Sequence, residues 1–162
     1  PVTILRPFNT FGPRQSQRAV IPTVIHQILD ENENSKLGDI HTTRDFNYVL
    51  DTCEAFYQCL SSESTIGDIF NTSSGYEISI ENTVKEIAKL INKKVNIVQI
   101  EERLRPAKSE VRRLVGSNLK LKKATGWSPT NDAKSSFLKG LGKTINWIRD
   151  HKSKDINYGY TI

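Results

Sequence analysis

The sequence of 162 residues contains no methionine, only two cysteines and no long apolar run. Without a stretch of about 20 apolar residues, we expect no helix that spans a bilayer. Cys53 and Cys59 are predicted to lie in one helix and to point to different sides of it, so a disulfide between them would strain the helix. No cysteine and histidine spacing fits a zinc site. We therefore expect two buried free thiols in a cytoplasmic protein.

The chain carries no signal-peptide pattern and opens at Pro1 in the middle of a predicted strand, so we expect a piece of a longer protein. Its formal net charge of +5 favours a polyanionic partner without saying which anion. The lysine-rich segments follow helical patterns that are typical of a solvated face. No helix-turn-helix or zinc-knuckle pattern accompanies the charge, which argues against a nucleic-acid partner. His26, His41 and His151 are scattered, and we expect them at the surface or in loops.

The apolar periodicity predicts one α/β domain of mixed character. Strands are expected to start at Val2, Asp45, Asp68 and Val95. Helices are expected over 19–29, from Asp51 through Leu60, for about 12 residues after the N-cap Ser79, between the cap Ser117 and Gly126, and along the stripe Leu138, Leu141, Ile145 and Ile148. Phe46, Tyr48 and Phe56 are expected to pack inward.

The first candidate site residue follows the opening strand. Val2 to Leu5 reads as a short buried strand, and Gly12-Pro13 indicates a turn shortly after it. Asn9 then lies just past the carboxyl end of that strand and should face outward. Polar groups at this place in an α/β sheet commonly point into a ligand crevice.

Arg44 is the second candidate, because a guanidinium can bind a phosphate with two hydrogen bonds. The alternative is a surface arginine paired with Asp45 or Asp39. Asn71 follows the strand at Ile69 and enters a loop rich in serine and glycine.

A second basic cluster adds Arg105. It precedes Pro106, which favours an extended backbone that projects the arginine side chain. Lys108 and Arg112, in the same cluster, are interpreted as solvated residues.

Four motifs resemble those of the extended short-chain dehydrogenase/reductases that act on nucleotide sugars, and they appear in that family's order. The run from Arg6 to Arg14 resembles the sixth-strand signature. Residues 38–51 resemble the family's Gly-Asp-Gly-x-x-x-Arg-Asp segment, with Ile40 in place of the second glycine. Arg105-Pro106 and the run ending in Gly126-Trp127-Ser-Pro129 are similar to the two later motifs.

The resemblance implies the C-terminal portion of an extended Rossmann-type enzyme, with residues 1–162 forming a small mixed α/β substrate-binding lobe and the N-terminal NAD-binding domain absent. It implies a nucleotide-sugar substrate, docking to the missing domain, a homodimer in the full-length protein, no membrane partner and no metal. Substrate contacts are implied for Asn9, Pro22, Leu37, Arg44, Asn71 and Arg105, and contacts near the nicotinamide of NAD for Pro7 and Phe8.

Among members of the family, the motifs look most like NAD-dependent 4,6-dehydratases of UDP- or GDP-linked N-acetylglucosamine. A nucleotide-sugar 4-epimerase is the alternative, since the residues that decide between them lie upstream. The sequence contains neither a Gly-rich dinucleotide loop nor the Tyr-x-x-x-Lys pair of the family, so the resemblance assigns no catalytic residue here and predicts that the piece alone is inactive. A non-catalytic module that binds nucleic acid or another polyanion is the remaining hypothesis.

Overall fold

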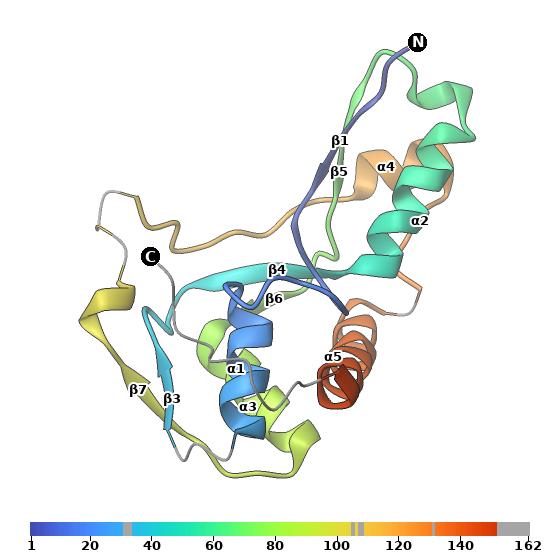
Figure 1. Ribbon diagram of the computed structural model, residues 1–162. Coiled ribbons are helices and arrows are strands. Elements are labelled where there is room, and N and C mark those ends of the chain that lie inside the picture. The colour runs from blue at the N-terminus through green and yellow to red at the C-terminus, as the bar shows by residue number, and fades with distance from the viewer. Residues whose placement is uncertain (31–33, 105, 107–108, 131, 152–162) are drawn as a thin grey trace. The chain divides into compact units, whose positions relative to one another are not determined.

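The computed structural model describes residues 1–30, 34–104, 106, 109–130 and 132–151 (Figure 1). Their strands are β1 (Ile4–Pro7), β2 (Asn9–Phe11), β3 (Asn34–Leu37), β4 (Thr43–Tyr48), β5 (Ile69–Thr72), β6 (Glu77–Ser79) and β7 (Asn96–Gln99). Their helices are α1 (Val20–Leu29), α2 (Val49–Leu60), α3 (Ile80–Ile91), α4 (Leu119–Thr125) and α5 (Ala133–His151), with 3₁₀ turns at Glu63–Thr65 and Glu101–Arg103. None of these helices is long and apolar enough to cross a membrane.

The chain divides into two compact units, each built from three separated segments. The first unit comprises Pro1–Phe11, Thr43–Ile78 and Arg112–Gly140, and the second comprises Gly12–Thr42, Ser79–Val111 and Leu141–Ile162. The units alternate along the chain, so no single linker divides the sequence between them. This explains why the sequence pattern indicated one undivided domain.

The first unit contains β1 paired with β5 and β2 paired with β4, both in parallel. β6 completes the sheet order β2-β4-β6. Ala55, Cys59 and Phe70 pack with Leu121 and Trp127 in one buried cluster. In Figure 1, α2 and α4 lie beside the β1 and β5 pair.

The second unit packs α1 against α3 and against β3, which pairs in parallel with β7. The apolar periodicity explains this packing, because the residues spaced three and four apart on α1 are buried, among them Val24, Ile25 and Ile28. Ser79 caps α3 as predicted, and its Oγ accepts a hydrogen bond of 3.1 Å from the backbone N–H of Asn82.

Three predictions about the burial of single side chains are wrong. Phe56 is 52% exposed, because the buried face of α2 passes through Thr52, Ala55 and Cys59 instead. Cys53 falls on the exposed side of the same helix, whereas Cys59 is buried, and both thiols are free. His26 is buried rather than exposed, since it lies on the packed face of α1.

The opening strand also differs from its prediction, because it is not buried: Val2 is 70% exposed and Ile4 is 48% exposed. The extended backbone does not end before Asn9, because a second strand, β2, begins at that residue. Phe8 separates the two strands, and its backbone N–H donates to the Thr72 carbonyl at 2.9 Å. Asn9 therefore has a fixed strand partner instead of lying in a loop. The predicted turn follows at Gly12, whose carbonyl accepts a hydrogen bond from the Gln15 N–H at 3.3 Å.

Candidate functional site

The candidate site residues of the first unit lie on two pairs of parallel strands. On β1 and β5, Arg6 is opposite Asn71 and Pro7 is opposite Thr72, so both strands end at the same edge. Ligands of open α/β sheets bind outside the carboxyl ends of such strands. On β2 and β4, Asn9 is opposite Phe46.

Asn9 and Arg44 share one face of the β2 and β4 pair. Side chains alternate along a strand, and opposite residues of a parallel pair point the same way, so Asn9, Phe46 and Arg44 lie on a common face. The ring of Phe11, two residues after Asn9, confirms the alternation, because its centroid lies 6.2 Å from that of Phe46.

Both side chains are half-buried and carry donors. The Nδ2 atom of Asn9 is buried and has no hydrogen-bond partner among the described residues. Nη1 of Arg44 donates to the carbonyl of Thr43 at 2.8 Å. An amide donor beside a guanidinium is a combination suited to anionic oxygens.

Further polar atoms near the ends of these strands are unpaired. Asn47 Oδ1, Thr72 Oγ1 and Ser73 Oγ are buried without partners within the part of the chain that the structure describes. The other end of the Asn47 amide is satisfied, because Nδ2 donates to the Thr72 carbonyl at 2.9 Å. Each buried unpaired polar atom costs about 1 to 3 kcal/mol. Asn47 follows Phe46 on β4, so its side chain lies on the face opposite to that of Asn9.

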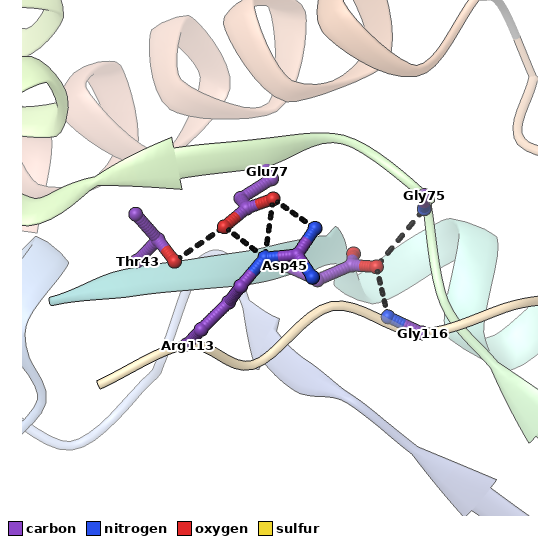
Figure 2. Close-up of polar contacts among 6 residues, drawn as sticks. All are labelled: Thr43, Asp45, Gly75, Glu77, Arg113 and Gly116. Atoms are coloured by element: carbon purple, nitrogen blue, oxygen red, sulfur yellow. Dashed lines mark hydrogen bonds and ion pairs between the residues drawn. The ribbon is translucent and has the colours of Figure 1, made fainter. Parts of the chain in front are cut away.

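Asp45 joins the loop after β5 to the segment that carries Gly116. Its buried carboxylate accepts hydrogen bonds from Ser74 N at 2.9 Å and Ser74 Oγ at 2.6 Å through Oδ1, and from Gly75 N at 2.9 Å and Gly116 N at 3.1 Å through Oδ2. Figure 2 shows the contacts of Asp45 with the two glycines. Because Asp45 follows Arg44 on the strand, it points to the opposite face. The alternative in which Asp45 serves as the ion-pair partner of Arg44 is therefore wrong.

Gly116 makes this close approach possible. A Cβ atom at position 116 would lie 2.5 Å from Ser73 Cβ and 2.7 Å from Cζ of Phe8. Any larger residue would push the segment away from both side chains. Glycine at this position therefore allows the segment to lie close to Ser73 and Phe8.

A second carboxylate, that of Glu77 on β6, accepts hydrogen bonds from Thr43 and Arg113 (Figure 2). Arg113 donates through Nε at 2.8 and 3.0 Å and through Nη2 at 2.8 Å, and Thr43 Oγ1 donates at 2.6 Å. Hydrogen bonds from Arg113, and then from Thr43, lower the pKa of Glu77 from 4.5 to about 2. The carboxylate is therefore ionised at neutral pH.

Comparison with known proteins assigns the chain to a family. A sequence model of the GDP-mannose 4,6 dehydratase family matches residues 1–138. The chain belongs to this family. It is 34% identical over 154 residues to the GDP-6-deoxy-D-mannose reductase of Pseudomonas aeruginosa, a match that covers 92% of this chain and 50% of that protein. It is 33% identical over 155 residues to the UDP-N-acetyl-alpha-D-glucosaminuronate decarboxylase of Bacillus cytotoxicus, covering 93% and 47%.

The GDP-mannose 4,6 dehydratase family assignment agrees with the solved structures. A structure of RMD from Pseudomonas aeruginosa complexed with NADPH has a TM-score of 0.75 and 33% identity, covering 87% of this chain and 47% of that one. Other relatives are named as dTDP-glucose 4,6-dehydratases and as epimerases. The chain spans about half the length of the curated relatives it matches. The predicted fold class, the C-terminal part of an extended Rossmann-type enzyme of mixed α/β character, is confirmed.

Not every residue that the family resemblance assigned lies in this unit. Pro22 and Leu37 belong to the second unit, where both side chains are buried. Arg105 lies outside the described residues. Substrate contacts by these three residues stay predictions, as do those by Asn9, Arg44 and Asn71.

The contacts of Pro7 and Phe8 with the nicotinamide of NAD stay predictions. Pro7 is exposed and Phe8 is half-buried, so they offer apolar surface directly after the carboxyl end of β1. The described residues contain no group of three or more His, Cys, Asp or Glu that could hold a metal ion.

Sequence reasoning missed the residues that support the site. Asp45, Glu77, Arg113 and Gly116 act through contacts between distant segments, and Gly116 lies 71 positions from Asp45. The sequence offered one signal for Asp45. It lies next to strand residues that were predicted to pack inward, and a buried aspartate needs hydrogen-bond donors around it.

Proposed function

We propose that this chain binds the diphosphate of a sugar nucleotide through Asn9, Arg44, Asn71 and Arg105. It would do so as the substrate-binding part of an NAD-dependent 4,6-dehydratase that acts on UDP- or GDP-linked N-acetylglucosamine. The observation that carries the proposal is the buried Nδ2 of Asn9, which has no hydrogen-bond partner in the described part of the chain and lies on the same face as Arg44. A diphosphate supplies the acceptor for the amide and the negative charge for the guanidinium.

The diphosphate is not the reacting part of the substrate, so its binding serves the reaction by positioning the sugar. A diphosphate held at two points fixes the sugar relative to the reacting groups, so that binding energy lowers the barrier as well as KM. NAD, when bound, supplies the hydride chemistry, and Pro7 and Phe8 would contact the edge of its nicotinamide. The reacting acid and base are expected elsewhere in the full-length enzyme, so the 162-residue chain alone should not turn over substrate.

A thermal-shift titration of the chain with UDP, GDP, UDP-N-acetylglucosamine and random-sequence DNA, at two salt concentrations, tests the proposal. We expect a salt-tolerant rise in Tm with one of the nucleotides. A response to DNA alone that disappears at the higher salt concentration would instead support a polyanion-binding module.

Arg44→Ala should weaken nucleotide diphosphate binding by about 1.5 to 3 kcal/mol, or about 10- to 150-fold, because a charge-assisted hydrogen bond is lost. Arg105→Ala should act similarly, and both should lower kcat/KM in the full-length enzyme. Arg149→Ala, which removes an equal charge from an exposed position on α5, is the control. Equal affinity of wild type and Arg44→Ala would contradict the assignment.

A 4-epimerase is the second candidate, supported by the structural similarity to epimerases at a TM-score of 0.80. Mass spectrometry of the product formed by the full-length protein distinguishes the two. A dehydratase product has lost one water, whereas an epimerase product has the mass of its substrate.

A further inference from the structure

Thr43 connects the Glu77 and Arg113 ion pair to Arg44. Its side-chain Oγ1 donates to Glu77, and its backbone N–H donates to the Arg112 carbonyl at 2.9 Å. Its carbonyl accepts from Leu114 N at 3.1 Å and from Nη1 of Arg44 at 2.8 Å. Both lone pairs of that carbonyl are therefore used, one by the neighbouring segment and one by the guanidinium.

The direction of this carbonyl depends on the segment that carries Arg113. Thr43 and Arg113 form a parallel bridge, and both side chains reach Glu77, which lies on β6. The two-point contact between Arg113 and Glu77 resists rotation better than a single hydrogen bond, even though both groups are accessible to solvent. Glu77 thus stabilises the bridge between Thr43 and Arg113. The bridge in turn orients the Thr43 carbonyl, which accepts the hydrogen bond from Arg44.

We propose that Glu77 and Arg113 are positioning residues, which act through Thr43 to hold the Arg44 guanidinium in the orientation that binds an anion. The proposal rests on the proposed function for its ligand, a nucleotide diphosphate. The orientation of Arg44 itself can be measured without any ligand.

Electrostatics and positioning make opposite predictions for Glu77→Gln. Removing a negative charge near Arg44 should strengthen anion binding if the carboxylate acts only through its field. If it acts by positioning, the same substitution should weaken binding, by about tenfold. The sign of the change therefore separates the two.

The experiment compares wild type with Glu77→Gln, Arg113→Lys and Thr43→Val, which leave the chain length and most of the packing unchanged. Thr43→Ser is the conservative variant that should retain wild-type behaviour. Asp68→Asn is the matched control, because it removes the carboxylate of another exposed ion pair of the first unit, with Lys120. Two quantities are measured, the ¹⁵N–¹H signals of the Arg44 guanidinium, assigned by their absence in Arg44→Ala, and the affinity for UDP and GDP.

In wild type we expect separate Nη signals for Arg44, because its Nη1 is held by the Thr43 carbonyl. In Glu77→Gln and Thr43→Val these should merge through rotation, and affinity should fall about tenfold while Asp68→Asn stays unchanged. Separate signals and unchanged or stronger binding in Glu77→Gln would overturn the positioning role and leave the proposed function standing. If wild type bound neither nucleotide, the proposed function would fail, and the Arg44 signals alone would decide whether Glu77 positions this side chain. If Glu77→Gln fails to fold, Arg113→Lys decides by the same two readouts.

Discussion

Asp45 connects β4 with the loop after β5 and with the segment that carries Gly116. Asparagine at this position would keep the shape of the side chain. It would replace one carboxylate oxygen by an NH₂ group, a donor that faces backbone N–H groups. We expect Asp45→Asn to lower the free energy of unfolding by about 2 to 4 kcal/mol, measured by urea denaturation. Asp150→Asn, at an exposed position on α5, should change it by less than about 0.5 kcal/mol. Equal stability of the two variants would contradict the four-bond arrangement.

Two glycines give a paired test of close packing. Gly116→Ala should destabilise the protein by about 1 to 3 kcal/mol, because the added Cβ would overlap Ser73 and Phe8. Gly142→Ala should instead stabilise it by about 0.5 to 1 kcal/mol, since nothing lies within 4 Å and position 142 is inside α5. Thermal unfolding of both variants measures the difference, and an unchanged or higher Tm for Gly116→Ala would show that space at Gly116 is not limiting.

Glu77 also predicts an acid dependence of stability. Its pKa in the folded protein is about 2, below its ordinary value of 4.5, so its contribution is complete above pH 4.5 and is lost as the pH falls toward 2. We expect the Tm of Glu77→Gln to fall less steeply than that of wild type between pH 4.5 and 2. Some acid dependence should persist, because hydrogen bonds also lower the pKa of Asp68, Glu81 and Asp132. A parallel course of the Glu77→Gln and wild-type curves would argue against the ion pair.

At the scale of single residues, the local sequence singled out Asn9 and Arg44 as candidates, but not the residues that hold the surrounding segments. A motif can mark a residue whose neighbours in sequence are characteristic. It cannot show that Gly116 and Asp45 meet, because that contact depends on how separate segments fold together.

Among the elements, the caps of two helices show where sequence patterns succeed. Ser79 caps α3 through a hydrogen bond, whereas Ser117 precedes the N-cap Asn118 of α4 and accepts only a long contact of 3.5 Å from Leu119 N. Ser79→Ala should therefore cost about 1 kcal/mol of unfolding free energy, and Ser117→Ala less than about 0.5 kcal/mol. Chemical denaturation of both variants compares them. Similar losses would mean that Ser117 caps its helix, as the sequence alone suggested.

The helices were the elements easiest to predict, because their apolar spacing runs over several turns. The predicted αL glycine after α4 is also present, with Gly126 at φ 77°. Strands β2, β3 and β6 were not predicted. Each has only three or four residues, and segments such as Asn34–Leu37 carry too little apolar character to stand out from a loop. Their partners in the sheets, rather than their own composition, make them strands.

For the whole molecule, the order of motifs correctly indicated a part of an extended Rossmann-type enzyme, and the family match over residues 1–138 confirms it. The two interleaved units were not predictable, because their boundaries coincide with no change in composition. The chain and its relatives agree over about half of each relative's length. Activity and substrate choice therefore have to be tested on the full-length protein, whereas diphosphate binding can be tested on this chain.

The side-chain amide of Asn9 reports on the central proposal most directly. Its ¹⁵N–¹H signals, assigned by their loss in Asn9→Ala, would be followed while UDP-N-acetylglucosamine or GDP is titrated into the chain. We expect these signals to shift with saturation for the nucleotide that binds, and to stay in place with uridine, which has no phosphate. Binding that leaves the Asn9 amide unmoved, or shifts it equally with uridine, would contradict a diphosphate site at Asn9 and Arg44.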